Sequence, residues 1–126
     1  MKFLVKFFLS AFLVFSVPLD VSAQEDVVVT KQYDDGGMYE GTFKNGLQHG
    51  IGTYRLPNGY EYSGEWVDGQ ILGVGVAKFP NGSVYEGNFI KGKPEGSGKI
   101  VFADGGTYEG TWLDGKITGQ GVAVYA

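Results

Sequence analysis

The sequence predicts an all-β protein, a single-layer antiparallel β-sheet or solenoid of consecutive hairpins. Three observations predict it. Rows that begin with tyrosine recur at a constant offset of 23 residues. Each row holds two segments whose apolar and polar residues alternate with the two-residue period of a strand. Gly-containing turn sequences separate these segments at two fixed points of every row. The rows begin at Tyr39, Tyr62, Tyr85 and Tyr108.

The first 23 residues have the features of a secretory signal peptide. Lys2 and Lys6 precede an apolar stretch from residue 7 to 17, and Pro18 precedes a small-residue cleavage site that ends at Ala23. The apolar stretch is about 11 residues, whereas a helix that spans a membrane needs about 20. We therefore expect cleavage after Ala23 and an exported protein, either periplasmic or secreted.

The remaining chain divides into a short N-terminal segment and four repeats. Residues 24–38 form an N-terminal strand and half-repeat, because "YDDGGMY" at 33–39 matches "FADGGTY" at 102–108. The repeats that follow occupy residues 39–61, 62–84, 85–107 and 108–126. An array of this kind buries its apolar surface by stacking neighbouring repeats.

Two kinds of turn alternate along the array. Asn45-Gly46 predicts a two-residue turn with positive φ at both positions, and Pro57-Asn58-Gly59 predicts a three-residue loop built on a type I turn. One even and one odd loop keep the aromatic residues of an odd-length repeat on one face of the sheet. We expect about nine strands and no helix after residue 23.

This pattern also predicts which residues face each other across a hairpin. We expect Tyr39 opposite Gly52, Gly41 opposite Gly50, and the same pairs in later rows, with flat glycine backbone beneath aromatic rings. One face then carries an aromatic ladder, and the other is mostly solvated but becomes apolar at Val101, Val122 and Val124. The expected ladder consists of Tyr39, Phe43, Tyr54, Tyr62, Trp66, Phe79, Tyr85, Phe89, Phe102, Tyr108 and Trp112.

The rows resemble the MORN (membrane occupation and recognition nexus) repeat, whose pattern is Tyr-Glu-Gly-x-Trp/Phe, a turn with Gly, then Gly-x-Gly. The resemblance covers residues 39–126. Ser63 replaces the usual Glu in the second row, and other residues replace His49 in the later rows. The resemblance implies a binding module, and members of the family commonly self-associate through their terminal repeats.

The composition argues against most catalytic and metal chemistry. The 126 residues include no Cys and a single His, which excludes disulfides, Cys-based zinc sites and a conserved His-based site in every row. The Gly-x-Gly pairs lie within predicted strands and lack the following helix that a phosphate loop needs. Glu40, Glu86 and Glu109 recur in equivalent rows, but solvated carboxylates explain them. We predict no enzyme, no cofactor and no metal.

The charge and the two ends of the array bear on possible partners. Without Lys2, Lys6 and Asp20 the mature chain has 8 basic and 13 acidic residues, which disfavours nucleic acid. Residues 27–33 and 121–125 are expected to be apolar edge strands that have no proline or charge cluster to prevent pairing with another chain. This favours a protein partner or self-association there. We interpret the protein as a binding or scaffolding module for protein–protein interaction.

The aromatic face leaves two interpretations open. Its rings are either core alone, or core and binding surface together. In the second case the protein is, alternatively, a cell-envelope binder of glycan or lipid headgroups. The candidate binding residues are Tyr39, Phe43, Tyr62, Trp66, Tyr85, Phe89, Tyr108 and Trp112.

Overall fold

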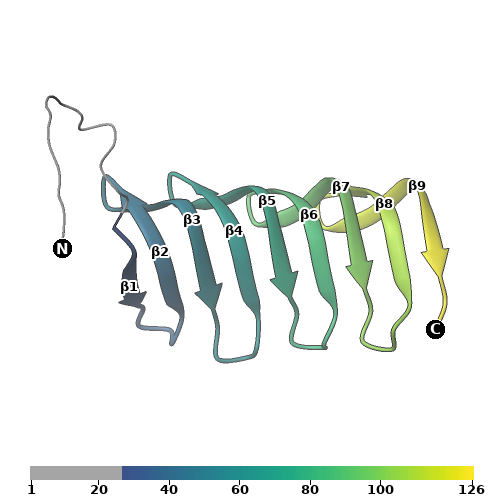
Figure 1. The fold of residues 1–126 in the computed structure, drawn as a ribbon, viewed down its shortest axis with the longest axis horizontal. Helices are drawn as coiled ribbons and strands as arrows, with labels where there is room; N and C mark the ends of the chain where they lie inside the picture. Colours follow the sequence, from purple (N-terminus) through teal and green to yellow (C-terminus); the bar gives the residue numbers. More distant parts are fainter. Residues whose placement is uncertain (1–26) are drawn as a thin grey trace, which may run out of the picture.

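A computed structural model describes residues 27–126, which form one open antiparallel sheet with the strands in sequence order (Figure 1). The expected signal peptide, residues 1–23, lies outside the described residues. The all-β prediction is confirmed, and residues 27–126 contain no helix long and apolar enough to cross a membrane. The strands are β1 (Val29–Gln32), β2 (Met38–Lys44), β3 (Leu47–Arg55), β4 (Glu61–Val67), β5 (Gln70–Lys78), β6 (Val84–Ile90), β7 (Lys93–Val101), β8 (Thr107–Leu113) and β9 (Lys116–Val124).

Both predicted turn types are confirmed. The two-residue turns after β2, β4, β6 and β8 place a non-glycine residue and then a glycine at positive φ, 53° and 79° at Asn45 and Gly46. In the three-residue loop after β3, Gly59 has a φ of 100° and its N–H donates to the Leu56 carbonyl. We call the four two-residue turns the turn row, and the three-residue loops at 34–36, 57–59, 80–82 and 103–105 the loop row.

The predicted cross-strand pairs are wrong by two residues in every hairpin. Tyr39 lies opposite Tyr54, and Gly41 lies opposite Gly52. The turn itself has the expected pairs, with Lys44 opposite Leu47, so the shift arises within the strand. The same shift recurs in the other three hairpins, and Tyr62, Tyr85 and Tyr108 lie opposite Ala77, Ile100 and Ala123.

A bulge at the first glycine of each Gly-x-Gly pair causes this shift. Gly50 has a φ of 91°, a left-handed conformation that favours glycine, so its backbone is not flat as expected. Thr42 stabilises the bulge, because its hydroxyl donates to the His49 carbonyl. Gly73, Gly96 and Gly119 also have positive φ, so each hairpin bends at the same point.

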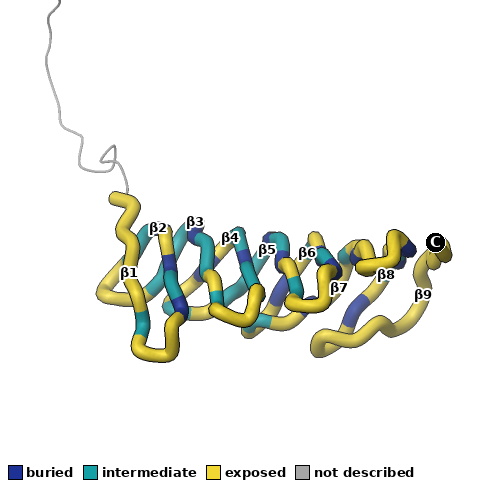
Figure 2. Tube along the Cα trace, turned by 90° about the horizontal axis from the view of Figure 1, so that it is seen from below, coloured by how far each residue is buried: buried dark blue, intermediate teal, exposed yellow. Residues whose placement is uncertain are grey.

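The bends curl the sheet, so that its turn row approaches its loop row. Figure 2, seen along the direction of the strands, shows the trace opened into two rows rather than one line. The Gln48 side chain beside the first turn donates a 2.7 Å hydrogen bond from Nε2 to the Tyr33 hydroxyl at the first loop. The inner face of the curl holds the buried aromatic core, and the outer face is exposed to solvent.

Candidate binding groove

Each repeat packs a tyrosine ring on glycine backbone. The Tyr39 ring lies over Gly52, where an added Cβ would overlap the ring. The Tyr39 hydroxyl donates to the Thr42 carbonyl at 2.9 Å, so its polar atom is paired although the side chain is 0% exposed. Tyr62 repeats this arrangement, with a 2.8 Å bond to the Glu65 carbonyl. Glycine provides the space and the hydroxyl bond satisfies the buried phenol.

Aromatic rings connect one repeat to the next. Tyr62 contacts Trp66 of its own repeat and Phe89 of the next, with centroids 5.6 and 4.9 Å apart and the planes nearly perpendicular. Tyr39 and Tyr85 make the same two kinds of contact. Edge-to-face pairs at this separation each add about 0.5 to 1.5 kcal/mol beyond burial. The ladder is therefore the continuous core of the array.

Burial raises the pKa of several of these phenols. The pKa of Tyr62 is raised most, by loss of solvation and by the nearby Glu65 carboxylate. Burial also raises the pKa of Tyr85 and of Tyr39. The neutral phenol is thus the form that the core holds at physiological pH.

An apolar groove runs between the turn row and the loop row. Its largest part has a volume of about 580 Å³ over the second half of the array. Leu56, Tyr60, Phe79 and Pro80 line it on the loop side, and Pro94 lines it on the turn side. A second part of about 340 Å³ continues toward the N-terminal half and shares Tyr60 with the first. The two parts give an elongated apolar site rather than a closed pocket.

Charged residues at the turn row form the rim of the groove. Lys93 Nζ lies 3.3 Å from the Asp114 carboxylate in the neighbouring turn, and both side chains are largely exposed. Lys116 also lines the groove. Exposed pairs such as Lys93 and Asp114 contribute at most about 1 kcal/mol, so the apolar wall dominates what this site can bind.

The structure places the predicted binding residues in the core. Tyr39, Tyr62 and Tyr85 are 0% exposed and Phe89 is 1% exposed, so these side chains are core residues first. Tyr85, Phe89 and Trp112 nevertheless line the larger part of the groove, and Trp66 lines the second part. The other predicted residues are also buried or partly buried: Trp66, Tyr108 and Trp112 in the core, and Phe43 packed against it. Of the remaining ladder, Tyr54 and Phe79 pack against the core, whereas Phe102 is 38% exposed.

Sequence reasoning missed the loop-side wall and the curl that produces it. Tyr60 was absent from the expected ladder, yet it lies 5.9 Å from Phe79 between ring centroids and its pKa is raised by burial. Pro94, at the second position after a turn, is buried. The sequence signal for the curl is the glycine that recurs at the position of Gly50 in every repeat, because a left-handed residue there bends the strand.

The single histidine has a structural role. His49 Nδ1 accepts a hydrogen bond from the Asp68 N–H at 3.2 Å and so caps the next turn of the turn row. Glu95 does the same for Asp114, at 3.0 Å, two repeats later. Within residues 27–126 no three His, Cys, Asp or Glu side chains gather in a way that could hold a metal ion.

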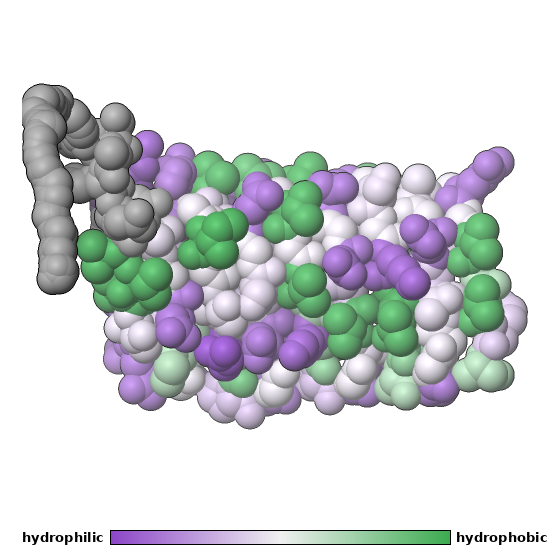
Figure 3. Space-filling view, viewed as in Figure 1, coloured by the Kyte–Doolittle hydropathy of each residue, from purple (hydrophilic) through white to green (hydrophobic). Residues whose placement is uncertain are grey.

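The outer face mixes apolar and polar side chains. Figure 3 shows separate green apolar areas among purple and white ones on the face turned to the viewer. Its exposed apolar residues include Ile51 and Val74, which are 65% and 55% exposed. Toward the C-terminal edge Val122 and Val124 are also exposed, as the sequence predicts.

Comparison with known proteins agrees with this architecture. The family model for the MORN repeat matches residues 39–59, 62–84, 85–107 and 108–126. No curated protein matches the chain significantly. Repeats of this family are generally involved in binding proteins or membranes, and the family is typically non-enzymatic. Since the four matches cover most of the sequence and coincide with the four structural repeats, the chain belongs to the MORN repeat family.

Proposed function

We propose that this protein is a non-enzymatic binding and scaffolding module that holds an extended segment of another protein in the groove. The observation that carries the proposal is the apolar groove of about 580 Å³ between the two rows. An elongated site of this kind suits a chain segment whose apolar side chains lie along it. The wall residues Tyr60 and Phe79, which are only partly buried, are the anchors in this account.

A glycan or a lipid headgroup is a weaker match to the same site. Sugars stack on exposed aromatic faces, whereas the rings of Tyr62 and Tyr85 are fully covered. The formal net charge of −4 opposes an anionic headgroup on average. Binding to cell wall or to lipid vesicles is therefore the alternative result of the peptide-selection experiment.

The proposal includes the absence of catalysis. His49, the only histidine, is occupied in capping a turn, and the phenols in the core have pKa values raised by burial rather than lowered. A general base near neutral pH needs the opposite shift for a phenol. The groove therefore provides binding surface without an activated group.

We further propose that the protein acts outside the cytoplasm, in a periplasm or after secretion. The support is the sequence of residues 1–23, with its two lysines, apolar stretch and small residues before Gln24. Mass spectrometry of the protein purified from its native host tests this directly. A mature form that begins at Gln24 is expected, and a protein that retains Met1 to Ala23 in the cytoplasm would contradict export.

Selection from a displayed random-peptide library tests the groove. We expect the selected peptides to be rich in apolar residues and to bind Tyr60→Ala at least about tenfold more weakly, because a buried interface ring is a common hot spot. Val74→Ala, on the outer face, is the matched control and should bind normally. Folding of both variants is checked by circular dichroism.

Two results would argue against the groove. Peptides that bind Tyr60→Ala and the unaltered protein equally would place the binding surface elsewhere. A protein that selects no peptide, but is retained on purified cell wall or on zwitterionic vesicles, would favour the glycan or lipid alternative.

A further inference from the structure

The last repeat lacks the inter-repeat contacts that the earlier ones receive. Tyr39, Tyr62 and Tyr85 each contact a ring of the following repeat at 4.9 to 5.1 Å. Within the described residues Tyr108 has only the contact with Trp112 of its own repeat, at 5.7 Å. Tyr108 therefore has a place beside it for one more aromatic ring.

The backbone carbonyl of Gly121 lies at the same position and also lacks the donor that its equivalents have. The indole N–H groups of Trp66 and Trp112 donate at 3.1 Å to the carbonyls of Gly52 and Gly98 in the preceding repeat. Gly121 is the next residue in that series, 23 residues after Gly98. In residues 27–126 no indole follows to donate to its carbonyl.

The turn row provides the second carbonyl. The N–H groups of Gly69, Gly92 and Gly115 donate to the carbonyls of Gln48, Ile71 and Pro94 at 2.8 to 3.1 Å. Each bond joins a turn to the strand of the preceding repeat. Ile117 is the corresponding residue of β9, and no later turn among the described residues donates to it.

The backbone of β9 continues this pattern along its free edge. Just after β3 the Leu56 N–H donates across the loop to the Tyr60 carbonyl. By the two-residue period, the backbone groups of Tyr54, Gly52 and Gly50 in β3 also point toward β4. The equivalent residues are Ala123, Gly121 and Gly119 in β9 and Tyr125 just after it. They therefore direct their N–H and C=O groups away from β8.

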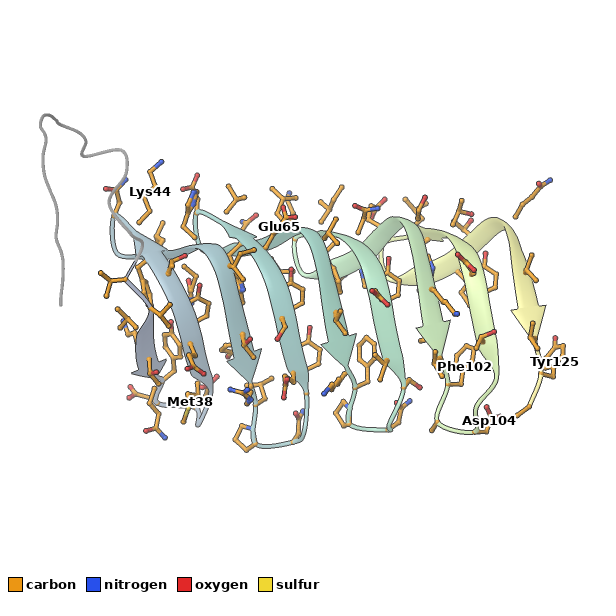
Figure 4. All side chains as sticks on the ribbon, in the orientation of Figure 1. Met38, Lys44, Glu65, Phe102, Asp104 and Tyr125 are labelled. Carbon is orange, nitrogen blue, oxygen red and sulfur yellow. The ribbon has the colours of Figure 1, made fainter. Side chains whose placement is uncertain are left out.

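The side chains of β9 show the same missing neighbour. Ala77 and Ile100 are 0% and 8% exposed where the next repeat covers them, whereas the equivalent Ala123 is exposed. Ile117 is 47% exposed, although Pro94 is buried at that position one repeat earlier. In Figure 4 Tyr125 extends from the end of β9, one repeat beyond Phe102.

We propose that β9 is a docking edge for a strand of another protein that carries the Tyr-x-Gly-x-Trp pattern of β4 and β8. The incoming glycine would lie opposite Gly121, the tyrosine opposite Ala123 and the tryptophan opposite Gly119, as Gly64, Tyr62 and Trp66 lie opposite β3. The tryptophan ring then covers Tyr108 and its indole donates to Gly121. This site is separate from the groove, and the proposal does not depend on the proposed function.

The occupant follows from the contacts rather than from the open edge alone. A second copy of this chain carries two such strands, β4 and β8, but each of them is paired on both sides within its own sheet. Within residues 27–126 the two edge strands of the sheet are β1 and β9, which are both of the other strand type and carry no tryptophan. The occupant that we assign to β9 is therefore a strand of a different protein that carries this pattern at its own edge.

Peptide binding to isotope-labelled protein tests the proposal. The probe has the sequence of residues 107–115, TYEGTWLDG, and a matched peptide has Ala in place of Trp112. We expect amide shifts at Ile117, Gly119, Gly121 and Ala123. The matched peptide should bind about tenfold more weakly, because it lacks the ring contact and the indole hydrogen bond.

Two protein variants locate the binding site. Ala123→Pro removes an outward N–H of β9 and should abolish binding, since proline is tolerated at an edge but cannot donate. Thr30→Pro makes the same change at the opposite edge, in β1, and should bind normally. The comparison of the two peptides needs no variant, so the test holds even if Ala123→Pro does not fold.

Several results would overturn the proposal. Equal affinity for the two peptides would show that the ring has no role, and absence of binding would show that β9 is not a docking edge. Shifts confined to Tyr60 and Phe79 would place the peptide in the groove. A doubled mass by light scattering that Ala123→Pro reduces to that of the monomer would identify a second copy as the occupant of β9.

Discussion

At the scale of single residues, Gly98 has no side chain because the Tyr85 ring occupies that space. An added Cβ would overlap the ring, and the Tyr85 hydroxyl already donates to the Asn88 carbonyl at 2.9 Å. Movement of the ring away from Gly98 would therefore strain this hydrogen bond. The same reasoning explains why tyrosine, and not phenylalanine, recurs at the start of all four repeats.

Gly98→Ala should consequently lower the free energy of unfolding by about 2 kcal/mol or more, because overpacked cores force side chains out of their rotamers. Chemical denaturation measures the change. Ser97→Ala is the matched control, because Ser97 precedes Gly98 in the chain and is exposed. It should change the free energy of unfolding by less than about 0.5 kcal/mol. Equal effects of the two substitutions would contradict the packing of Tyr85 on Gly98.

The buried phenols predict a loss of stability in alkali. Burial raises the pKa of Tyr62, Tyr85 and Tyr39 above the ordinary value of 10.0. Above that value the unfolded chain releases protons that the folded protein keeps, so the free energy of unfolding falls as the pH rises toward the raised pKa values. Below it these groups cause no pH dependence.

Denaturation at about pH 8 and at about pH 11 measures this effect, and Tyr62→Phe is the matched variant. At the lower pH we expect Tyr62→Phe to be about 1 kcal/mol less stable, because it lacks the hydrogen bond to the Glu65 carbonyl. At the higher pH the difference should shrink or reverse, since phenylalanine does not titrate. A difference that is constant with pH would rule out Tyr62 as a source of the alkaline instability.

At the scale of elements, the hairpins were predictable because their turns have distinct residue requirements. Asn45-Gly46 and Pro57-Asn58-Gly59 each specify one loop geometry, and the strands between them alternate with a two-residue period. The bulges were not predictable in the same way. Gly50 and Gly52 look alike in the sequence, yet Gly50 has a φ of 91° and Gly52 is extended backbone beneath a ring.

The turn row predicts a stabilising substitution. Lys91 has a φ of 51°, which lysine rarely adopts, whereas Asn45 occupies the equivalent position of the first repeat. Lys91→Asn should raise the free energy of unfolding by about 0.5 to 1 kcal/mol. Lys91→Val should lower it, because a β-branched residue is disfavoured at positive φ. Thermal unfolding of both variants measures these changes in stability. A valine variant that is more stable than the unaltered protein would contradict the turn assignment.

At the scale of the whole molecule, the regular period joins the repeats into one core. Each tyrosine meets a ring of the next repeat in the same geometry, so the array behaves as a stack of nearly equivalent units. The continuous core and strand order follow from the sequence period. The groove does not, because it requires the bend at four bulges and the approach of two rows of turns.

Removal of one complete repeat should therefore leave a folded protein. Deletion of residues 62–84 brings Phe89 to the place of Trp66 beside Tyr39, and we expect cooperative unfolding with a smaller denaturant m-value, in proportion to the surface lost. Deletion of residues 62–83 is the matched control. It shifts the strand by one residue, exposes the ladder and should prevent folding. Similar folding of the two deletions would contradict the register.

Photocrosslinking in the native host shows directly whether a protein segment lies in the groove. A photoreactive phenylalanine analogue replaces Tyr60 on the groove wall in one form of the protein and Val74 on the outer face in another. We expect that one discrete protein is crosslinked from position 60 and not from position 74. A partner crosslinked only from position 74, or equally from both, would contradict it.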